Sequence, residues 1–291
     1  MAFLKLHNVS AALEVQMPAM GTKEWTTFVD SHVNIGSRPR CCVKHQRLWH
    51  LLQAISRVPL ALRATLPRAE FGVRDAVTIR ALANSSNEER TAQWHGFDSF
   101  QGLPQSESAK PRRGVAQYTW KAGAFTRGGR LPTVPRNVQL HPGWFNQSLA
   151  SFMTAQEAAA GGAAYPHGFA FVHMDADIYE STLSVLNLIF AQCWYRRGSV
   201  FAFDELFGPA SQAEHEFRAL TEASTRHGVQ WHFLSYHLTP SSTFARAAVQ
   251  IDSGCAWERH GSIHGPQDMP QDHTRSGTPL LAAQTEEGRT N

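Results

Sequence analysis

FVHMDADIY, residues 171–179, is an apolar run that ends in two aspartates and leads directly into a helical pattern. Further apolar runs alternate with helical patterns along the chain, which predicts βαβ units and a parallel sheet covered on both faces. The last two runs have no clear helix between them, so an antiparallel pair is expected at one edge. The expected strands are residues 69–73, 93–97, 138–140, 168–174, 199–203, 229–234 and 245–251, and the expected helices are residues 78–83, 147–156, 179–193 and 212–227.

The chain of 291 residues is long enough for one large α/β domain with extensions at both ends. Apolar residues make up 42% of it and charged residues 18%, which suffices to build a core. We expect an N-terminal helical or accessory segment at residues 1–67, with an amphipathic helix at residues 45–58 that Pro59 ends. Residues 68–252 are expected to form the main domain, and the polar residues 253–291 a disordered tail.

Charge, hydropathy and cysteine content argue against several classes of protein. Lys and Arg number 27 against 24 Asp and Glu, and they are scattered, whereas nucleic-acid binding usually needs a denser basic stripe. No stretch approaches the roughly 20 apolar residues of a membrane helix. The cysteines lack the spacing of a zinc site or a disulfide scaffold, so we expect reduced thiols in a cytoplasmic protein that binds neither nucleic acid nor a membrane. These cysteines are Cys41, Cys42, Cys193 and Cys255.

Polar residues that directly follow a strand are the candidate ligand-binding residues, because open parallel sheets bind ligands beyond the carboxyl ends of their strands. Glu70 and Gly72 end the first expected strand, where the glycine lets a ligand approach the backbone and the carboxylate could hold a polar group. An ordinary turn would give the same pattern. Asp98 ends the second strand, where nucleotide-binding sheets hold ribose hydroxyls, although it or Ser99 could instead cap a helix.

Two later strands each end in a pair of acids. Asp175 and Asp177 stand two positions apart, and two neighbouring anions repel unless a cation or a proton neutralises them. This spacing indicates a hard metal ion held by oxygens, but Asp177 capping the next helix while Asp175 bonds internally would also explain it. Asp204 and Glu205 end the following strand, where a solvated turn is the alternative. Together the two strands would place up to four carboxylates on one rim of the sheet.

Four motifs in these segments resemble the macrocin O-methyltransferase-type family of class I S-adenosylmethionine-dependent methyltransferases. The similarity extends from about Glu70 to Ile251. The motifs are GFDSFQGLP at 96–104, GWFNQSL at 143–149, HMDADIYEST at 173–182, and FDELFG at 203–208 followed by AEHEF at 213–217. The resemblance implies a Rossmann-like α/β fold with a seven-stranded, mostly parallel sheet and helices on both faces. Residues 68–252 would then be the methyltransferase domain.

The resemblance also implies how the cofactor S-adenosylmethionine binds. Glu70 and Gly72 fall in the first cofactor motif, and Asp98, with Ser99 beside it, falls on the ribose. The chain departs from the family pattern in that motif, since Asp75 and Ala76 stand where the family often has a glycine.

The same mapping implies a metal and an acceptor. Asp175, Asp204 and Glu205 fall where related members bind Mg²⁺, although many of those members have a second aspartate where this chain has Glu205. The family's acceptors are hydroxyls on small molecules such as sugars or other secondary metabolites. The metal would lower the pKa of the acceptor hydroxyl, and Asp175 is the expected base. His173 is an alternative base, but a histidine inside an apolar strand is more often a core residue.

Other functions stay open at this point. The Asp175 and Asp177 pair also matches the DxD anchor of glycosyltransferases that use nucleotide sugars, although the other acidic strand ends would then have no role. The glycine-poor first motif also suits a member of the fold that binds a ligand without catalysis. Residues 105–135, a loop far longer than ordinary connections, are expected to form a lid or a substrate-binding insertion. A homodimer is one option for the assembly.

Overall fold

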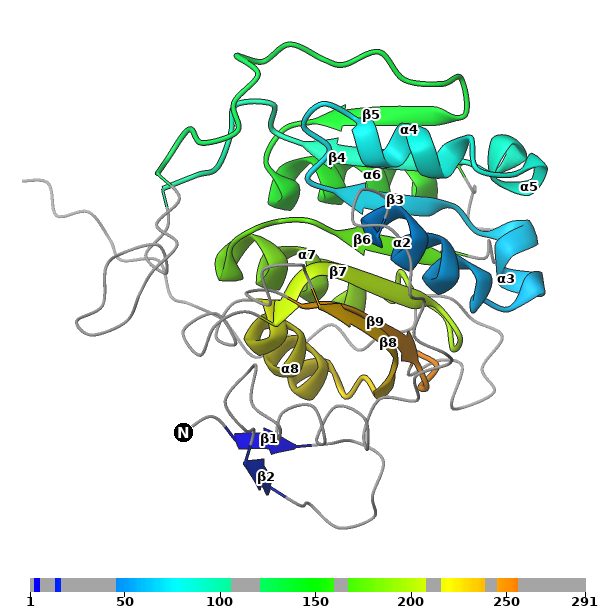
Figure 1. The fold of residues 1–291 in the computed structure, drawn as a ribbon, viewed down its shortest axis with the longest axis vertical. Helices are drawn as coiled ribbons and strands as arrows, with labels where there is room; N and C mark the ends of the chain where they lie inside the picture. Colours follow the sequence, from blue (N-terminus) through cyan, green and yellow to red (C-terminus); the bar gives the residue numbers. More distant parts are fainter. Residues whose placement is uncertain are drawn as a thin grey trace, which may run out of the picture.

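The computed structural model describes residues 3–5, 14–16, 46–105, 121–159, 167–207, 216–238 and 245–255. Its main feature is a seven-stranded sheet in the order β5-β4-β3-β6-β7-β9-β8 (Figure 1). The strands are β3 (Arg68–Phe71), β4 (Trp94–Asp98), β5 (Val138–Pro142), β6 (Phe171–Met174), β7 (Val200–Phe207), β8 (Trp231–Leu238) and β9 (Ala245–Ile251). Strands β3 to β7 pair in parallel, whereas β9 is antiparallel to both β7 and β8. The predicted fold class is confirmed, including the antiparallel edge.

Helices cover both faces of this sheet (Figure 1). One core lies under α2 and α4, and the other lies under α6, α7 and α8. The helices are α2 (Gln46–Ser56), α3 (Leu60–Thr65), α4 (Val77–Ala83), α5 (Asn87–Thr91), α6 (Phe145–Ala159), α7 (Tyr179–Ala191) and α8 (Glu216–His227). The sequence pattern missed the short helices α3 and α5. Two short strands, β1 (Phe3–Lys5) and β2 (Glu14–Gln16), form a separate antiparallel sheet that was not predicted either.

The alternation along β6 decides which side chains face which core. Phe171 belongs to the core under α2 and α4, whereas Val172 and Met174 belong to the core under α6 to α8. Because successive side chains of a strand point to opposite faces, His173 lies on the same face as Phe171. The central strand therefore directs a titratable side chain toward the α2 side of the sheet.

Helix α2 is part of the core of the domain. Its residues Leu51, Ala54 and Ile55 are buried, and the helix packs against β7, β8 and β9. The predicted amphipathic helix is confirmed, and it ends at Ser56, before Pro59. The predicted boundary after residue 67 stays a prediction.

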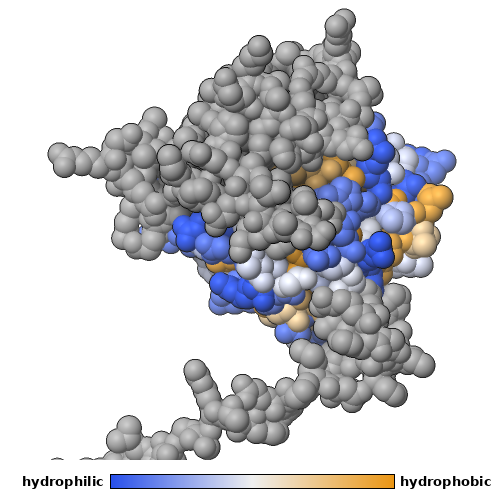
Figure 2. Space-filling model, turned by 90° about the horizontal axis from the view of Figure 1, so that it is seen from below, coloured by the Kyte–Doolittle hydropathy of each residue, from blue (hydrophilic) through white to orange (hydrophobic). Residues whose placement is uncertain are grey.

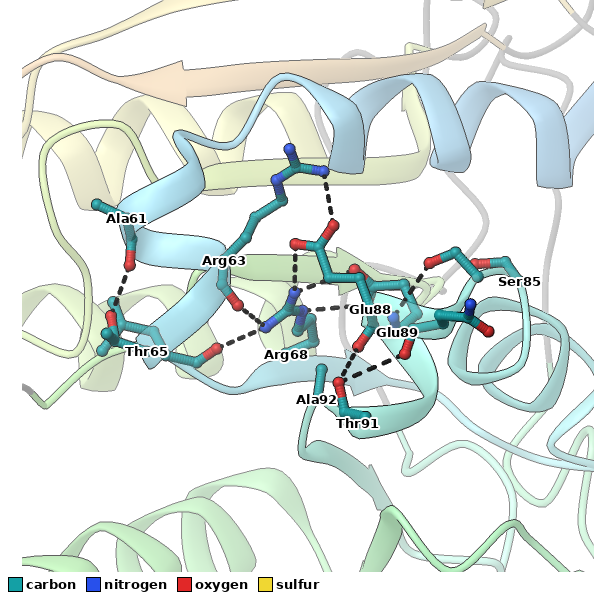
Figure 3. A network of polar contacts seen from close by, with 12 residues as sticks. Ala61, Arg63, Thr65, Arg68, Ser85, Glu88, Glu89, Thr91 and Ala92 are labelled. Carbon is teal, nitrogen blue, oxygen red and sulfur yellow. Dashed lines mark hydrogen bonds and ion pairs between the residues drawn. The ribbon is translucent and has the colours of Figure 1, made fainter.

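A buried ion pair holds the amino end of β3 (Figure 3). Arg68, which is 1% exposed, donates from Nε and Nη2 to the two carboxylate oxygens of Glu89, at 3.1 and 3.0 Å. Its Nη1 donates to the carbonyl oxygens of Arg63 and Leu66, at 2.7 and 2.8 Å. These contacts join β3 to α3 and α5. They also compensate the positive charge of Arg68, which would be costly to bury without partners.

A disulfide bond joins Cys193, just after α7, to Cys255, just after β9. The prediction of reduced thiols is therefore wrong for this pair. The two cysteines are 62 positions apart and meet only because the fold brings the carboxyl end of α7 near the carboxyl end of β9, so their sequence spacing gave no signal. Cys41 and Cys42 lie outside the described residues. Since disulfides persist mainly in oxidising compartments, the bond weighs against the predicted cytoplasmic location, which stays a prediction.

The described surface has no large continuous apolar area in the view of Figure 2, where hydrophobic groups are small and lie between hydrophilic ones. Within the described residues, no helix combines the length and the apolar character needed to span a bilayer. The predicted loop at residues 105–135 and the predicted tail at residues 253–291 are described only in part. Residues 106–120 and 256–291 lie outside the described part of the chain.

Candidate active site

A cavity of about 580 Å³ lies beyond the carboxyl ends of β3, β4 and β6 and beside the second half of β7. Open parallel sheets bind ligands at this edge, and the volume is in the range of small-molecule sites. Six of the eight predicted site residues line the cavity, whereas Glu70 and His173 do not. The six are Gly72, Asp98, Ser99, Asp175, Asp204 and Glu205.

Gly72 brings the end of β3 against the end of β6. Its φ is +93°, and a Cβ on it would lie 1.8 Å from the carbonyl oxygen of Asp175. Hydrogen bonds fix this approach, because the amide of Asp175 donates to the carbonyl of Phe71 at 2.9 Å, and that of Gly72 donates to Phe97 at 3.0 Å. Any side chain at position 72 would have to displace the backbone that carries Asp175.

Asp98 links two loops at the edge of the cavity. Its Oδ2 accepts a hydrogen bond from the amide of Arg74 at 2.7 Å, and its Oδ1 accepts one from the amide of Phe100 at 2.6 Å. Ser99 organises the same turn, since its hydroxyl donates to the carbonyl of Gly102. Among the described residues no helix begins here, so the helix-cap alternative is wrong. Each carboxylate oxygen keeps a second acceptor site, which is available to hydrogen-bond donors in the cavity.

Glu70 and His173 form a buried pair away from the cavity. They are direct neighbours in the β3 and β6 register, and Nδ1 of His173 lies 3.2 Å from Oε2 of Glu70. Both side chains are at most 1% exposed. Burial raises the pKa of Glu70, although the hydrogen bond with His173 opposes the shift. Glu70 and His173 therefore have no direct access to the cavity. Their predicted roles, as a cofactor ligand and as a base, would need such access.

Two arginines lie among the carboxylates of the acidic rim. Nη2 of Arg47, from the first turn of α2, donates to Oδ2 of Asp175, and Nε of Arg47 lies 2.9 Å from Oδ1 of Asp204. Arg246, from β9, donates from its Nε to the same oxygen of Asp204 at 2.7 Å. The end of β6 and the middle of β7 are thus bridged by a guanidinium group that comes from the N-terminal segment, and Asp204 and Glu205 lie within β7 and do not end it as predicted.

This arrangement gives the three predicted metal ligands different proton affinities. Burial and the adjacent Asp204 raise the pKa of Asp175, against the opposing effect of Arg47. Burial alone would raise the pKa of Asp204, but Arg47 and Arg246 hold it below its ordinary value. Burial, with the charges of Asp204 and Asp175, raises the pKa of Glu205 to about 7. Asp204 therefore keeps its negative charge to lower pH than an isolated aspartate, whereas the pKa of Glu205 lies near neutral pH.

Asp177 also lines the cavity, although the following helix does not use it as a cap. The N-cap of α7 is Ile178, with no side-chain hydrogen bond, so the capping explanation for Asp177 is wrong. Its φ of +61° is uncommon for a residue with a side chain. Burial and the neighbouring Asp175 and Glu205 raise the pKa of Asp177 well above its ordinary value.

The predicted Mg²⁺ site does not fit this arrangement of side chains. Magnesium needs several oxygens close to octahedral positions, at roughly 2.0–2.1 Å. Within the described residues, no group of three or more His, Cys, Asp or Glu side chains could hold a metal ion. The guanidinium of Arg47 instead contacts both Asp175 and Asp204. The magnesium site stays a prediction, which the observed contacts do not favour.

Sequence reasoning missed several residues that line the cavity. Arg74 and Phe125 form one wall, where the guanidinium carbon lies 5.1 Å from the centre of the ring. Trp144 and Asn146 form another, and both belong to the GWFNQSL motif, which was quoted for resemblance without an assigned role. Arg47 had no recognisable signal, because it lies in a segment expected to be accessory.

No family model matches the sequence, and no curated protein matches it. Among solved structures, the chain is similar to the O-methyltransferase NovP, at 17% identity over 78% of this chain and 94% of NovP, with a TM-score of 0.46. It is also similar to LepI in complex with SAM, at 12% identity over 80% of this chain and 53% of LepI, with a TM-score of 0.38. A third similar structure is magnesium protoporphyrin IX methyltransferase from Synechocystis PCC 6803 with bound SAH, at 11% identity over 79% of this chain and 93% of that protein, with a TM-score of 0.36.

Proposed function

We propose that the protein is an S-adenosylmethionine-dependent methyltransferase that methylates a hydroxyl oxygen of a small molecule. The observation that carries this proposal is the division of one cavity into two unlike sides. Gly72 and Asp98 form a backbone-rich side suited to a nucleoside, and Asp175, Asp204 and Glu205 form a carboxylate side facing the same space. The chain has a seven-stranded Rossmann-like fold, and this cavity lies at its ligand-binding edge.

The cofactor would lie along the turns after β3 and β4. Gly72 has no side chain, so the amino-acid part of S-adenosylmethionine could lie close to the backbone of this turn. Asp98 would accept hydrogen bonds from the ribose hydroxyls. Asp98 is prepared for this task, because its contacts with Arg74 and Phe100 fix its orientation before a ligand arrives. Ser99 supports the cofactor side indirectly, through the turn that it closes with Gly102.

The carboxylate side would receive the acceptor. In the reaction the acceptor oxygen attacks the methyl carbon in line with the sulfonium, the C–S bond breaks, an O–C bond forms, and the hydroxyl proton leaves. Asp175 is the base that we propose, because it lines the cavity and its raised pKa favours taking a proton. His173, buried against Glu70, would help to hold β6 in place.

The acceptor would combine an apolar surface with hydroxyl groups. Phe125 and Trp144 offer aromatic faces to the cavity, and the acidic rim offers several hydrogen-bond acceptors. A sugar or another hydroxylated metabolite presents both kinds of surface. The absence of nucleic-acid partners and a homodimeric state stay predictions.

A labelled-methyl assay tests this function. The protein would be incubated with S-adenosylmethionine carrying a labelled methyl group and with pools of hydroxylated sugars and phenols, and the products would be separated by mass. A parallel incubation with nucleotide sugars tests the DxD glycosyltransferase alternative. We expect a mass gain of one methyl group in an acceptor. Sugar transfer without methyl transfer would favour the alternative, and tight binding of cofactor without any product from broad pools would favour a non-catalytic role.

A further inference from the structure

We propose that Arg47 supplies, from within the chain, the positive charge of the acidic rim, so that the site works without a divalent cation. The inference rests on the proposed function for its meaning in catalysis, but the contacts that support it do not depend on the reaction. Arg47 contacts both Asp175, directly after β6, and Asp204, within β7.

The position of Arg47 is fixed by the helix that carries it. Leu51 lies four residues further along α2, and residues four apart share one face of a helix. Leu51 is 1% exposed, and the next turns bury Ala54 and Ile55 in the same core. The buried face of α2 therefore continues into Arg47, whose half-buried side chain reaches Asp175 and Asp204.

The balance of charge around the rim favours a cation at this place. Asp175, Asp204, Glu205 and Asp177 all line the cavity, and close carboxylates cannot all ionise without compensation. Of these four carboxylates, the described contacts join Arg246 to Asp204, whereas they join Arg47 to both Asp204 and Asp175. A metal ion bound to these two carboxylates would have to displace the guanidinium, because both would occupy the space between the same oxygens.

A guanidinium can carry out part of the work of a metal in such a site. It remains charged throughout the accessible pH range and has five N–H donors. Nη2 donates to Asp175, whereas Nε lies 2.9 Å from Asp204 in an ion pair without hydrogen-bond geometry. A remaining donor could bind the acceptor oxygen and stabilise negative charge that develops there as Asp175 takes the proton. The chain's own residues would then orient the hydroxyl and move its proton.

Direct metal binding tests this proposal without any acceptor. Mn²⁺ would be titrated into the full chain and followed by electron paramagnetic resonance, for the wild type, Arg47→Ala, and the matched control Arg57→Ala. Arg57 follows α2 and is exposed, so its removal changes the net charge equally but leaves the rim intact. Thermal unfolding would show that each variant is folded.

We expect the wild type and Arg57→Ala to bind Mn²⁺ weakly and alike. Arg47→Ala should bind one equivalent at least about tenfold more tightly, because a like charge within about 4 Å is removed. Adding Asp204→Asn to Arg47→Ala should abolish that gain. Tight one-to-one binding by the wild type that Asp204→Asn removes would overturn the proposal, and so would equal binding by all three proteins. Titration of the same samples with S-adenosylhomocysteine tests the proposed function separately, since cofactor binding does not depend on this outcome.

Discussion

The carbonyl oxygen of Asp175 lies where a side chain on Gly72 would begin, at 1.8 Å from the position of a Cβ. The turn that is expected to receive the cofactor and the strand end that is expected to receive the acceptor are therefore in direct backbone contact. A change at one of these residues must move the other.

Gly72→Ala should damage the site and the fold together. The methyl group would meet the backbone of β6, so we expect a large loss of stability and loss of binding of S-adenosylhomocysteine. Gly128→Ala is the matched control, because Gly128 also has a positive φ, of +61°, but has open space around its Cβ position. The control should lose only about 1–2 kcal/mol, the cost of a left-handed conformation. Equal effects in chemical denaturation would show that the contact with Asp175 is unimportant.

Asp175→Asn should be the most damaging substitution for turnover that the fold still tolerates. The amide keeps the shape of the side chain but cannot take the acceptor's proton, so turnover should fall by at least about a hundredfold. Affinity for S-adenosylhomocysteine should stay close to that of the wild type, because Gly72 and Asp98 carry that task. Glu157→Gln, on the exposed part of α6, serves as the control. Turnover near the wild-type value would show that the carboxylate is structural.

Glu89→Ala should destabilise the protein without affecting the site. It removes the hydrogen-bonded carboxylate partner of the buried guanidinium of Arg68 and leaves the carboxylate of Glu88, at 3.8 Å, which should cost up to about 3–5 kcal/mol. The neighbouring Glu88 has a side chain that is 42% exposed and pairs with Arg63 at 3.3 Å, so Glu88→Ala should cost less than about 1 kcal/mol. Urea denaturation compares the two variants. A similar loss in both would contradict the dominant role of the buried pair.

Acidification should destabilise the protein through His95 and His141. Burial, and for His95 also the proximity of His141, lowers the pKa of His95 to about 3, and burial lowers the pKa of His141 to about 4. Both values lie below the ordinary value of 6.5, so the folded state binds fewer protons than the unfolded state as the pH falls below that value. Stability that is present above about pH 6.5 is therefore lost on acidification.

The variant His95→Phe isolates this effect. Between pH 7.5 and 5, the free energy of unfolding of the wild type should fall by on the order of 1–2 kcal/mol more than that of the variant. The difference between the two proteins removes the contribution of other groups, such as Glu205, whose raised pKa acts in the opposite direction. Parallel pH profiles of the two proteins in denaturation experiments would show that the lowered pKa of His95 does not contribute to the pH dependence of stability.

The sequence predicted the sheet well because its signals are local. Apolar runs mark the strands, and the acids near the ends of these runs mark one edge of the sheet, which is why Asp98, Asp175 and Asp204 all line one cavity. Glu70 and His173 do not line the cavity, and the alternation of side chains along a strand explains why. Both lie within strands and point toward the core under α2, and being near a strand end does not reveal that direction.

The features that sequence reasoning missed depend on contacts between distant segments. Arg47 reaches Asp175 across 128 positions, and Cys193 meets Cys255 across 62. Neither contact has a local sequence pattern. The first exists only when α2 has packed against the sheet, and the second only when β9 has paired within the sheet. The packing of α2 also explains why the magnesium expected from the acidic residues alone does not fit their observed surroundings.

Calorimetric titration of the wild type and Asp98→Ala with S-adenosylhomocysteine tests the central claim most directly. The account predicts one binding site per chain in the wild type, and a loss of roughly 1–3 kcal/mol of binding free energy in Asp98→Ala, the range for a buried hydrogen-bond partner of a polar group. The control Glu157→Gln should bind like the wild type. Absence of binding by the folded wild-type protein, or unchanged affinity in Asp98→Ala, would contradict the assignment of this cavity to the cofactor.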